Sequence, residues 1–498
     1  MLDNLWLGLT TAFTPQNLLW CFAGVLLGTV IGLLPGMGSS TGIAILIPLT
    51  LTVEPVTALI MLAGIYYGSQ YGGTITSVLL STPGEAASVV TTMDGYQMAR
   101  QGRAGAALAI AAIGSFAAAI LSLVLLAALA PPFAEFALRF GPAENLAVMV
   151  LALVTMVAFS TGSKLRAGAM ACAGVLLACV GIDAGGGQAR YTFGNVNLLS
   201  GIPYVEVVIG LFAVGEVLHQ IHAGAAEPIR ARFRDLSLRR SELRESAGAI
   251  GRGSALGFLL GCLPGAGSTL ASFIAYGVEK RVSKNSARFG HGAIQGVAAP
   301  ESANNAAANA NFIPTLTLGI PGGATTAVLL GALTVYGLQP GPLLFAEQPE
   351  LVWGLLVSFF IGNVILLVLN LPLAPVFAQL LRIPYGYLYP IILVTSFVGA
   401  FAIDNNVFSV WLVLVFGVVG YGMKRFGLPM APLVVGVVIG ALFEKALVQT
   451  SAIHDGNLLL VFTRPIAVVI LALAAALVAG PAVLRRLRSP RTDEEIHV

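Results

Sequence analysis

The sequence is poor in charged residues. Asp, Glu, Lys and Arg make up only 10% of its 498 residues, whereas 57% are hydrophobic and the mean hydropathy is +0.88. Soluble domains carry about 25% charged residues, so we exclude a soluble enzyme and expect no nucleic-acid partner. Apolar stretches of about 20 residues, the length that crosses a bilayer, recur along nearly the whole chain. The composition therefore predicts an all-α polytopic protein embedded in a lipid bilayer.

The chain also lacks the residue patterns of catalysis and of metal binding. Its four cysteines, Cys21, Cys172, Cys179 and Cys262, lie in apolar segments without the spacing of metal ligands. This placement favours packing residues over disulfides or ligands. No Ser/His pair, paired aspartates or His-Glu-x-x-His motif lies in the apolar segments, which argues against an intramembrane enzyme. We expect no enzymatic activity, no cofactor and no metal beyond a transported Na⁺.

Basic residues are missing from positions 1–99 and then occur in six clusters. The clusters lie at 100–103, 164–166, 230–252, 280–288, 424–425 and 485–491. Cytoplasmic loops are enriched in Lys and Arg, so we place all six clusters inside, the N-terminus in the periplasm and the C-terminus in the cytoplasm. Continuous spans are then expected at about 105–130, 144–162, 165–181, 202–222, 351–371, 384–402, 407–423, 428–446 and 462–484.

A phrase built on Leu-Pro-Gly occurs twice. Gly-Leu-Leu-Pro-Gly-Met-Gly-Ser-Ser at 32–40 returns as Gly-Cys-Leu-Pro-Gly-Ala-Gly-Ser-Thr at 261–269, and a looser pair follows at 81–88 and 319–326. Irregular backbone at membrane depth survives only when it is buried in protein or lines a cavity. Matched breaks in two halves indicate the binding site of a transporter. We therefore expect a substrate site where these breaks meet.

The charges beside the two phrases predict opposite orientations. The second phrase lies in a hairpin, 251–279, with basic clusters on both flanks, whereas the first hairpin, 19–52, has none. We therefore expect two re-entrant helical hairpins that enter from opposite faces, within an inverted-topology repeat. The alternative is that each hairpin forms two tilted full spans. The expected total is about 11 full spans plus two hairpins.

This topology divides the chain into four parts. The first membrane repeat is 1–222, with the hairpin 19–52 and a broken helix at 56–99, and a cytoplasmic amphipathic linker follows at 223–250. The second repeat is 251–484, with the hairpin 251–279 and a broken helix at 291–338, and 485–498 form a cytoplasmic tail.

The residues of the breaks suit an anionic substrate. Glycine permits close backbone approach, Ser and Thr cap helices, and a half-helix that starts within the membrane directs free N–H groups and a positive dipole end at the cavity. Neither phrase contains Gly-Lys-[Ser/Thr], so neither is a Walker A loop and we expect no ATP hydrolysis. The candidate substrate-binding residues are Pro35, Gly36, Gly38, Ser39, Ser40, Pro83, Gly84, Pro264, Gly265, Gly267, Ser268, Thr269, Pro321 and Gly322.

A polar segment at 300–312 supplies the candidates for cation coupling: Glu301, Asn304, Asn305 and Asn309. An ionisable residue inside a membrane is a functional-site hypothesis by default, and hard cations favour carboxylate and amide oxygens. Burial favours the protonated form of a carboxyl, so Glu301 is also a candidate proton carrier. The structural alternative is that the asparagines join helices. We expect Glu85 to lie at a solvated tip.

Together these residues resemble the large membrane subunit of the tripartite tricarboxylate transporters. The resemblance rests on the doubled Leu-Pro-Gly-x-Gly phrase, the Pro-Gly pairs, residues 66–74 and residues 300–312, and it covers essentially the whole chain. It implies a secondary transporter of the bacterial inner membrane that imports citrate-like tricarboxylates or other organic carboxylates, driven by Na⁺ or H⁺. The implied partners are a small four-helix membrane subunit and a periplasmic solute-binding protein.

Two alternative functions remain besides a cation-coupled carboxylate importer. One is the large subunit of a tripartite ATP-independent carrier, and the other is a passive channel, which the discontinuous hairpins disfavour. For an importer we expect an elevator-like mechanism. The broken elements, 19–99 and 251–338, would then move past the continuous spans, 105–222 and 351–484.

Overall fold

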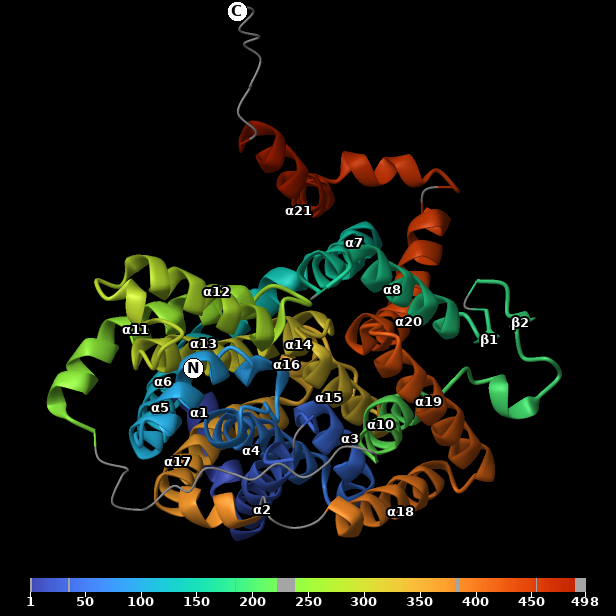
Figure 1. Ribbon diagram of the computed structural model, residues 1–498. Helices are drawn as coiled ribbons and strands as arrows, with labels where there is room; N and C mark the ends of the chain where they lie inside the picture. Colours follow the sequence, from blue (N-terminus) through green and yellow to red (C-terminus); the bar gives the residue numbers. More distant parts are fainter. Residues whose placement is uncertain are drawn as a thin grey trace, which may run out of the picture.

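A computed structural model describes residues 2–34, 36–160, 162–183, 185–221, 238–380, 385–453 and 455–488. The described chain is built from α-helices, and its one sheet is a two-stranded antiparallel pair, β1 (Gly181–Ile182) and β2 (Ala189–Arg190). The all-α architecture that the composition predicts is confirmed. The helices of the two Leu-Pro-Gly regions lie together in one part of the molecule, and α21 (Pro465–Arg488) lies at its edge against α7 (Figure 1).

In the first half, each break in the apolar sequence ends a helix. The elements before the long helices are α1 (Leu2–Ala12), α2 (Pro15–Gly32), α3 (Ser39–Thr50), α4 (Pro55–Leu80), η1 (Ala86–Ser88) and α5 (Thr92–Arg100). The Leu-Pro-Gly phrase separates α2 from α3. Ser81, which ends α4, has a positive φ of 59°. This left-handed conformation is uncommon outside glycine, and it turns the chain away from the helix axis.

The second half repeats this arrangement. Its elements are α11 (Arg240–Gly261), α12 (Gly267–Val282), η5 (Ser286–Arg288), α13 (Gln295–Ala310), α14 (Phe312–Leu318) and α15 (Ala324–Val335). The second phrase separates α11 from α12, and Gly319 ends α14 with a φ of 70°. Helix α11 runs without interruption through residue 250, where we expected the linker to end, so the hairpin arm begins at Arg240. Residues 223–237 of the expected linker lie outside the described part of the chain.

Three glycines in each half let a hairpin helix pack directly on the backbone of the broken helix. A β-carbon at Gly28 would lie 2.4 Å from the carbonyl oxygen of Ile65, and one at Gly257 would lie 2.3 Å from that of Ala303. The other members are Gly24 and Gly32 in α2 and Gly253 and Gly261 in α11. Small residues at helix interfaces are the usual means of close packing in membranes. The α2–α4 and α11–α13 pairs therefore share one packing mode at corresponding positions.

The remaining elements flank these two units. They are α6 (Ala104–Ala137), α7 (Pro142–Phe159), α8 (Lys164–Ala178), η2 (Val196–Leu198), α9 (Tyr204–Val208), a π-helical segment (Ile209–Val214), α10 (Gly215–Gln220), α16 (Leu344–Glu347), α17 (Pro349–Leu380), α18 (Tyr385–Asp404), α19 (Val407–Arg425), α20 (Met430–Ile453) and η6 (Leu458–Thr463). Helix α8, with 15 residues, is shorter than the span expected at 165–181.

Six helices of the described chain are long and apolar enough to cross a membrane. They are α2, α6, α7, residues 349–369 of α17, α19 and α20. Shorter apolar helices, among them α3 and α15, accompany them. Of the two arms of the first hairpin, α3 is too short to span, as a re-entrant hairpin requires, whereas α2 is long enough to do so. Re-entrance of the hairpins therefore stays a prediction. The count of about 11 spans and the inverted orientation stay predictions.

Candidate functional site

The beginnings of three helices converge between the two halves. The hydroxyl of Ser39, the first residue of α3, lies 3.0 Å from that of Thr325, the second residue of α15. The backbone N–H of Gly267, where α12 begins, donates to the carbonyl of Gly322, just before α15. Several of the sequence-predicted substrate residues are therefore neighbours, although they come from positions 38 to 322 of the chain. Each helix directs free N–H groups toward this region.

A carboxylate of the chain itself occupies the N-terminus of α3. Oε2 of Glu85 accepts hydrogen bonds from the backbone N–H of Ser39 at 2.6 Å and from its hydroxyl at 2.8 Å. The side chain fits because Gly38 and Gly73 lack side chains: a β-carbon at Gly38 would lie 2.9 Å from the same oxygen. Glu85 is half-buried and bound, rather than at the solvated tip that we expected. It demonstrates that this helix end binds carboxylate.

The start of α12 has a different environment. Ser268 is buried and lies near the hydroxyl of Tyr66. The amide nitrogen of Asn311 donates a hydrogen bond to the same hydroxyl at 3.4 Å. Gln70, one helical turn after Tyr66, is 1% exposed, and neither its amide nitrogen nor its oxygen has a hydrogen-bond partner among the described residues. The Oδ1 atom of Asn311 has none either. Free polar groups, which are costly when buried, therefore gather beside this helix end.

The other predicted substrate residues lie around this region in different ways. Gly84 donates its N–H to Thr76, and Gly322 donates to Thr315, so both Pro-Gly turns are tied back to the helix that precedes them. Pro264 and Pro321 are buried, and Pro83 is partly so. Ser40 and Thr269 are partly buried and take no part in the contacts described above. Pro35 lies outside the described residues.

The two Gly residues after Leu-Pro face the flanking helices instead of each other. Gly36, at φ 81°, lies against α10, where its β-carbon would meet Glu216 and Gln220, whereas Gly265, at φ 76°, lies against Met156 of α7. Glu216 forms an ion pair with Lys424 at the end of α19. A basic side chain therefore lies close to the first hairpin tip, which sequence reasoning missed because Lys424 is nearly 400 positions away.

Glu301, the predicted coupling carboxylate, connects the two halves. It is 1% exposed, and its two oxygens accept hydrogen bonds from the hydroxyls of Thr74, at 2.7 Å, and Thr91, at 2.5 Å. No ion pair to it is formed within the described residues. A carboxyl group buried in this way requires a proton or a cation as compensation, which is the behaviour expected of a coupling group.

The three asparagines near Glu301 point in different directions. The amide nitrogen of Asn305 donates to Ser115 at 2.7 Å, and that of Asn309 donates to Ser122 at 2.8 Å, so both face α6. The side chain of Asn304, fully buried, has no hydrogen-bond partner in the described part of the molecule. Asn305 and Asn309 thus join helices, as in the structural alternative, and the four candidates do not surround one point.

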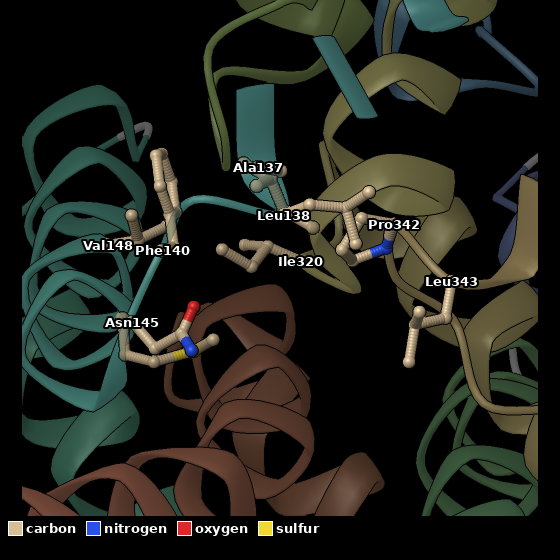
Figure 2. A pocket seen from close by; sticks show the side chains of 10 residues that line it. Ala137, Leu138, Phe140, Asn145, Val148, Ile320, Pro342 and Leu343 are labelled. Atoms are coloured by element: carbon tan, nitrogen blue, oxygen red, sulfur yellow. The ribbon is translucent and has the colours of Figure 1, made fainter. Parts of the chain in front are cut away.

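Two cavities adjoin this region. A small cavity of about 20 Å³ has room for one water molecule or one ion. Its lining is mixed, with Tyr71, Ser115, Asn305 and Asn363 beside four apolar residues. A pocket of about 200 Å³ lies where Ile320 faces the ends of α6 and α7 (Figure 2). Apart from Asn145, side chains of apolar residues line the second pocket. It therefore lacks the donors that a carboxylate needs.

Sequence reasoning assigned no site role to four polar members of this region. They are Glu85, which was expected at a solvated tip, and Tyr66, Gln70 and Thr325. All four belong to segments that had been noted for polarity or for Pro-Gly breaks, and Asn311 belongs to the polar segment 300–312 that supplied the coupling candidates. An alignment of Pro83-Gly84 with Pro321-Gly322 sets Glu85 opposite Gly323. This difference between the two halves is the signal that could have drawn attention to the Pro-Gly breaks.

Comparison with known proteins gives a consistent picture. The model of the Tripartite tricarboxylate transporter TctA family matches residues 18–435. The chain is 46% identical over 492 residues to a protein of Agrobacterium vitis described as an uncharacterized 52.8 kDa protein in the TAR-I ttuC′ 3′ region, covering 99% of this chain and 98% of that protein. A second protein of the same organism, from the TAR-II ttuC′ 3′ region, is 47% identical over 235 residues, which is 47% of this chain and 97% of that protein. No solved structure matches.

Proposed function

Since the chain belongs to the tripartite tricarboxylate transporter TctA family, we propose that it is the membrane subunit of a secondary transporter. In this proposal it imports citrate-like tricarboxylates or related organic carboxylates, driven by a gradient of Na⁺ or H⁺. A periplasmic solute-binding protein delivers the substrate, and a small four-helix membrane subunit completes the assembly. The protein then resides in the bacterial inner membrane, with its N-terminus in the periplasm and its C-terminus in the cytoplasm.

One observation carries this proposal: the N-termini of three helices meet at breaks that contain no basic residue. The starts of α3, α12 and α15 are joined by the Ser39–Thr325 and Gly267–Gly322 contacts. The four breaks, 32–41, 81–88, 261–269 and 319–326, contain no Lys or Arg. Helix N-termini stabilise anions through free N–H groups and the helix dipole. In discontinuous transporter helices such ends bind carboxylate groups of substrates, and the Glu85–Ser39 contact supplies a carboxylate in this pose.

Energy coupling is proposed at Glu301. Its buried carboxylate lies between the two halves, so a cation or proton bound there would change the interaction of α4 with α13. A bound cation also supplies countercharge for a multivalent anion held at breaks that contain no Lys or Arg themselves. Glu301, Asn304, Asn305 and the 20 Å³ cavity beside Asn305 are the proposed participants. Asn309, which bonds α6, contributes only through packing.

For the transport cycle we propose that the two hairpins enter from opposite faces and move together past a scaffold. Helix α6 moves with them, since its Ser115 and Ser122 bond Asn305 and Asn309 on α13. The moving unit contacts the scaffold at few polar points, among them Thr41 with the carbonyl of Phe212. Sliding of one unit past the other is the alternating-access scheme of repeat-built transporters.

The test is citrate uptake into proteoliposomes that contain the purified protein, its small subunit and its binding protein. Uptake should stop when the ion gradient is collapsed. Ser268→Ala should raise the apparent citrate constant about 5- to 150-fold, because a lost hydrogen bond to a charged group costs about 1–3 kcal/mol. Ser39→Ala should have the smaller effect, since the Ser39 hydroxyl already bonds Glu85.

The matched control is Ser254→Ala. The hydroxyl of Ser254 bonds only the carbonyl of Ile250 in its own helix, α11, so citrate uptake should be unchanged. If both Ser39→Ala and Ser268→Ala transport citrate like the wild type, the substrate is bound elsewhere. Uptake that persists without any ion gradient would indicate a passive channel instead of a carrier.

A further inference from the structure

The two Pro-Gly breaks differ at one position. Pro83-Gly84 and Pro321-Gly322 each lie two residues after a left-handed residue, Ser81 at φ 59° and Gly319 at φ 70°. The breaks can therefore be aligned residue by residue. The residue that follows each Pro-Gly is Glu85 in the first half and Gly323 in the second. One half thus has a carboxylate where the other has no side chain.

In the first half this side chain extends to the start of a hairpin helix. Glu85 reaches Ser39, where α3 begins, and binds both its N–H and its hydroxyl. Gly73 on α4 leaves the space, since a β-carbon there would lie 2.7 Å from Cβ of Glu85. The carboxylate has no ion-pair partner among the described residues. Neutral donors and the end of α3 are what compensate its charge.

In the second half the corresponding space is open. A β-carbon built on Gly323 would have only two neighbours, Cα of Gly267 at 3.4 Å and Nδ2 of Asn311 at 3.8 Å. Gly267 begins α12, as Ser39 begins α3. A side chain at 323 would therefore extend toward the start of α12, and none is present. The backbone of Gly323 is extended, with φ −169°, so its glycine is not needed for conformation.

An amide donor faces the same space. Asn311, which corresponds to Gly73 in the alignment of the breaks, is 1% exposed, and its Nδ2 atom would lie 3.8 Å from a β-carbon at Gly323. This nitrogen donates to the hydroxyl of Tyr66 at 3.4 Å and has a second hydrogen to donate, whereas Oδ1 is directed at Gly322.

Gln70, equally buried and without any hydrogen-bond partner among the described residues, lies with Ser268 near the hydroxyl of Tyr66. Buried amides without partners are rare in folded proteins. The position of this amide beside an open helix end points to a polar ligand that is bound during function.

We propose that a carboxylate group of the substrate binds at the start of α12 in the position that Glu85 occupies at the start of α3. The amide of Asn311 and the hydroxyls of Ser268 and Tyr66 donate hydrogen bonds to it, and Gln70 binds another polar group of the same molecule. This inference rests on the proposed function and deepens it. Glu85 serves as the fixed anion of one hairpin, and the substrate supplies the anion of the other.

The first experiment places a carboxylate of the chain in the open space. Gly323→Glu should raise the apparent citrate constant in proteoliposome uptake more than about tenfold, because the new side chain occupies the helix end. Gly323→Ala is the comparison of smaller size, since its β-carbon meets nothing closer than 3.4 Å, and its constant should rise less than that of Gly323→Glu. Citrate uptake by Gly323→Glu equal to that of Gly323→Ala would overturn the proposal.

A second variant keeps the proposal testable if Gly323→Glu does not insert. Asn311→Ala removes a donor without adding bulk and should raise the citrate constant about 5- to 150-fold. Thr334→Ala, on the exposed side of α15 with its hydroxyl bonded to Gly331 of the same helix, should leave it unchanged. An unchanged constant in Asn311→Ala would also overturn the proposal.

The third experiment is independent of the transported substrate. Glu85→Gly empties the first site and makes it resemble the second, so acetate should then raise the melting temperature of the purified protein more than it does in the wild type. Acetamide, its neutral analogue, should not. If the wild type neither binds nor transports citrate, the proposed function is wrong about the substrate. The acetate result still decides whether these helix ends bind a carboxylate from solution. Equal effects of acetate and acetamide on Glu85→Gly would contradict the inference.

Discussion

The hydroxyl of Thr74, in the middle of α4, donates a 2.7 Å hydrogen bond to the carboxylate of Glu301 on α13. The broken helices of the two halves are therefore joined at a buried ionisable group. Thr91, between η1 and α5, donates to the other oxygen. Any change in the charge of Glu301 alters its hydrogen bonds to both segments at once, which makes it a suitable point for coupling an ion to a movement.

The first prediction concerns this carboxylate. Glu301→Gln keeps the size of the side chain but removes its charge and its titratable proton. If the driving ion is H⁺, citrate accumulation in response to a pH gradient should be lost. If it is Na⁺, sodium-stimulated citrate binding should persist with a weaker ion constant, because the oxygen of the amide replaces one carboxylate oxygen. The measurement is uptake into proteoliposomes under separate Na⁺ and pH gradients.

Glu144→Gln is the matched control. Glu144 is also buried, but its carboxylate caps α7 by accepting the N–H of Gly141. Along the chain, Glu144 is distant from the breaks and from residues 300–312. Its substitution should leave the ion dependence unaltered. An unchanged ion dependence and accumulation ratio in Glu301→Gln would make Glu301 a structural residue.

Much of the fold around the site follows from local sequence. The Leu-Pro-Gly phrases and the Pro-Gly pairs lie between helices, because Pro and Gly interrupt helical hydrogen bonding. The apolar stretches predict the starts of the long helices α6, α17 and α20 within two residues, although these helices end seven to nine residues later than expected. The segment expected as an amphipathic linker, 223–250, contains the first turns of α11, which begins at Arg240. A change from polar to apolar composition does not by itself end a helix, because the backbone hydrogen bonds continue through it.

The site itself could be predicted only in part. Ser39 and Ser268 are capping-type residues at recognisable helix starts, and Glu301 is conspicuous as a charge in an apolar segment. The direction of Asn305 and Asn309 was not predictable, because it depends on the rotation of α13 against α6. The contact of Asp94 with Tyr276 and with three backbone N–H groups at 290–293 also depends on the packing of the two halves, which no local pattern reveals.

The second prediction tests the glycine-mediated packing. Gly257→Ala would place a β-carbon 2.3 Å from the carbonyl oxygen of Ala303, and such overpacking costs about 1–3 kcal/mol. The melting temperature of the purified protein should fall. Gly251→Ala, two turns earlier in α11, meets nothing within 4 Å and should keep or raise it, since alanine favours helix. Equal melting temperatures for the two variants would contradict the close packing of α11 on α13.

The third prediction concerns topology. Glu54 follows the first hairpin, Lys284 follows the second, and both are exposed. In a chain whose four cysteines have been replaced, an impermeant thiol reagent should label Glu54→Cys only from the periplasmic side and Lys284→Cys only from the cytoplasmic side. Labelling is measured on right-side-out and inverted vesicles, with lysed vesicles as the control for accessibility. Labelling of both positions from the same face would rule out the inverted repeat.

The fourth prediction tests movement between the hairpins and the scaffold. Thr41 on α3 donates its hydroxyl to the carbonyl of Phe212 at 3.3 Å, and Phe212 lies in the π-helical segment between α9 and α10. If the hairpins slide past this segment, a crosslink between Thr41→Cys and Phe212→Cys should stop citrate uptake, and a reducing agent should restore it.

A crosslink within the scaffold provides the comparison. The amide of Asn406 donates to Asn197 at 2.8 Å, joining the loop before α9 to the start of α19. A crosslink between Asn197→Cys and Asn406→Cys should leave uptake intact, because both residues belong to the set that stays fixed. Each crosslink is quantified by the mobility of the oxidised protein before uptake is measured. Full transport with the Thr41–Phe212 crosslink formed would mean that α3 does not move relative to the π-helical segment. The substrate would then have to reach both faces by rearrangement of the breaks alone.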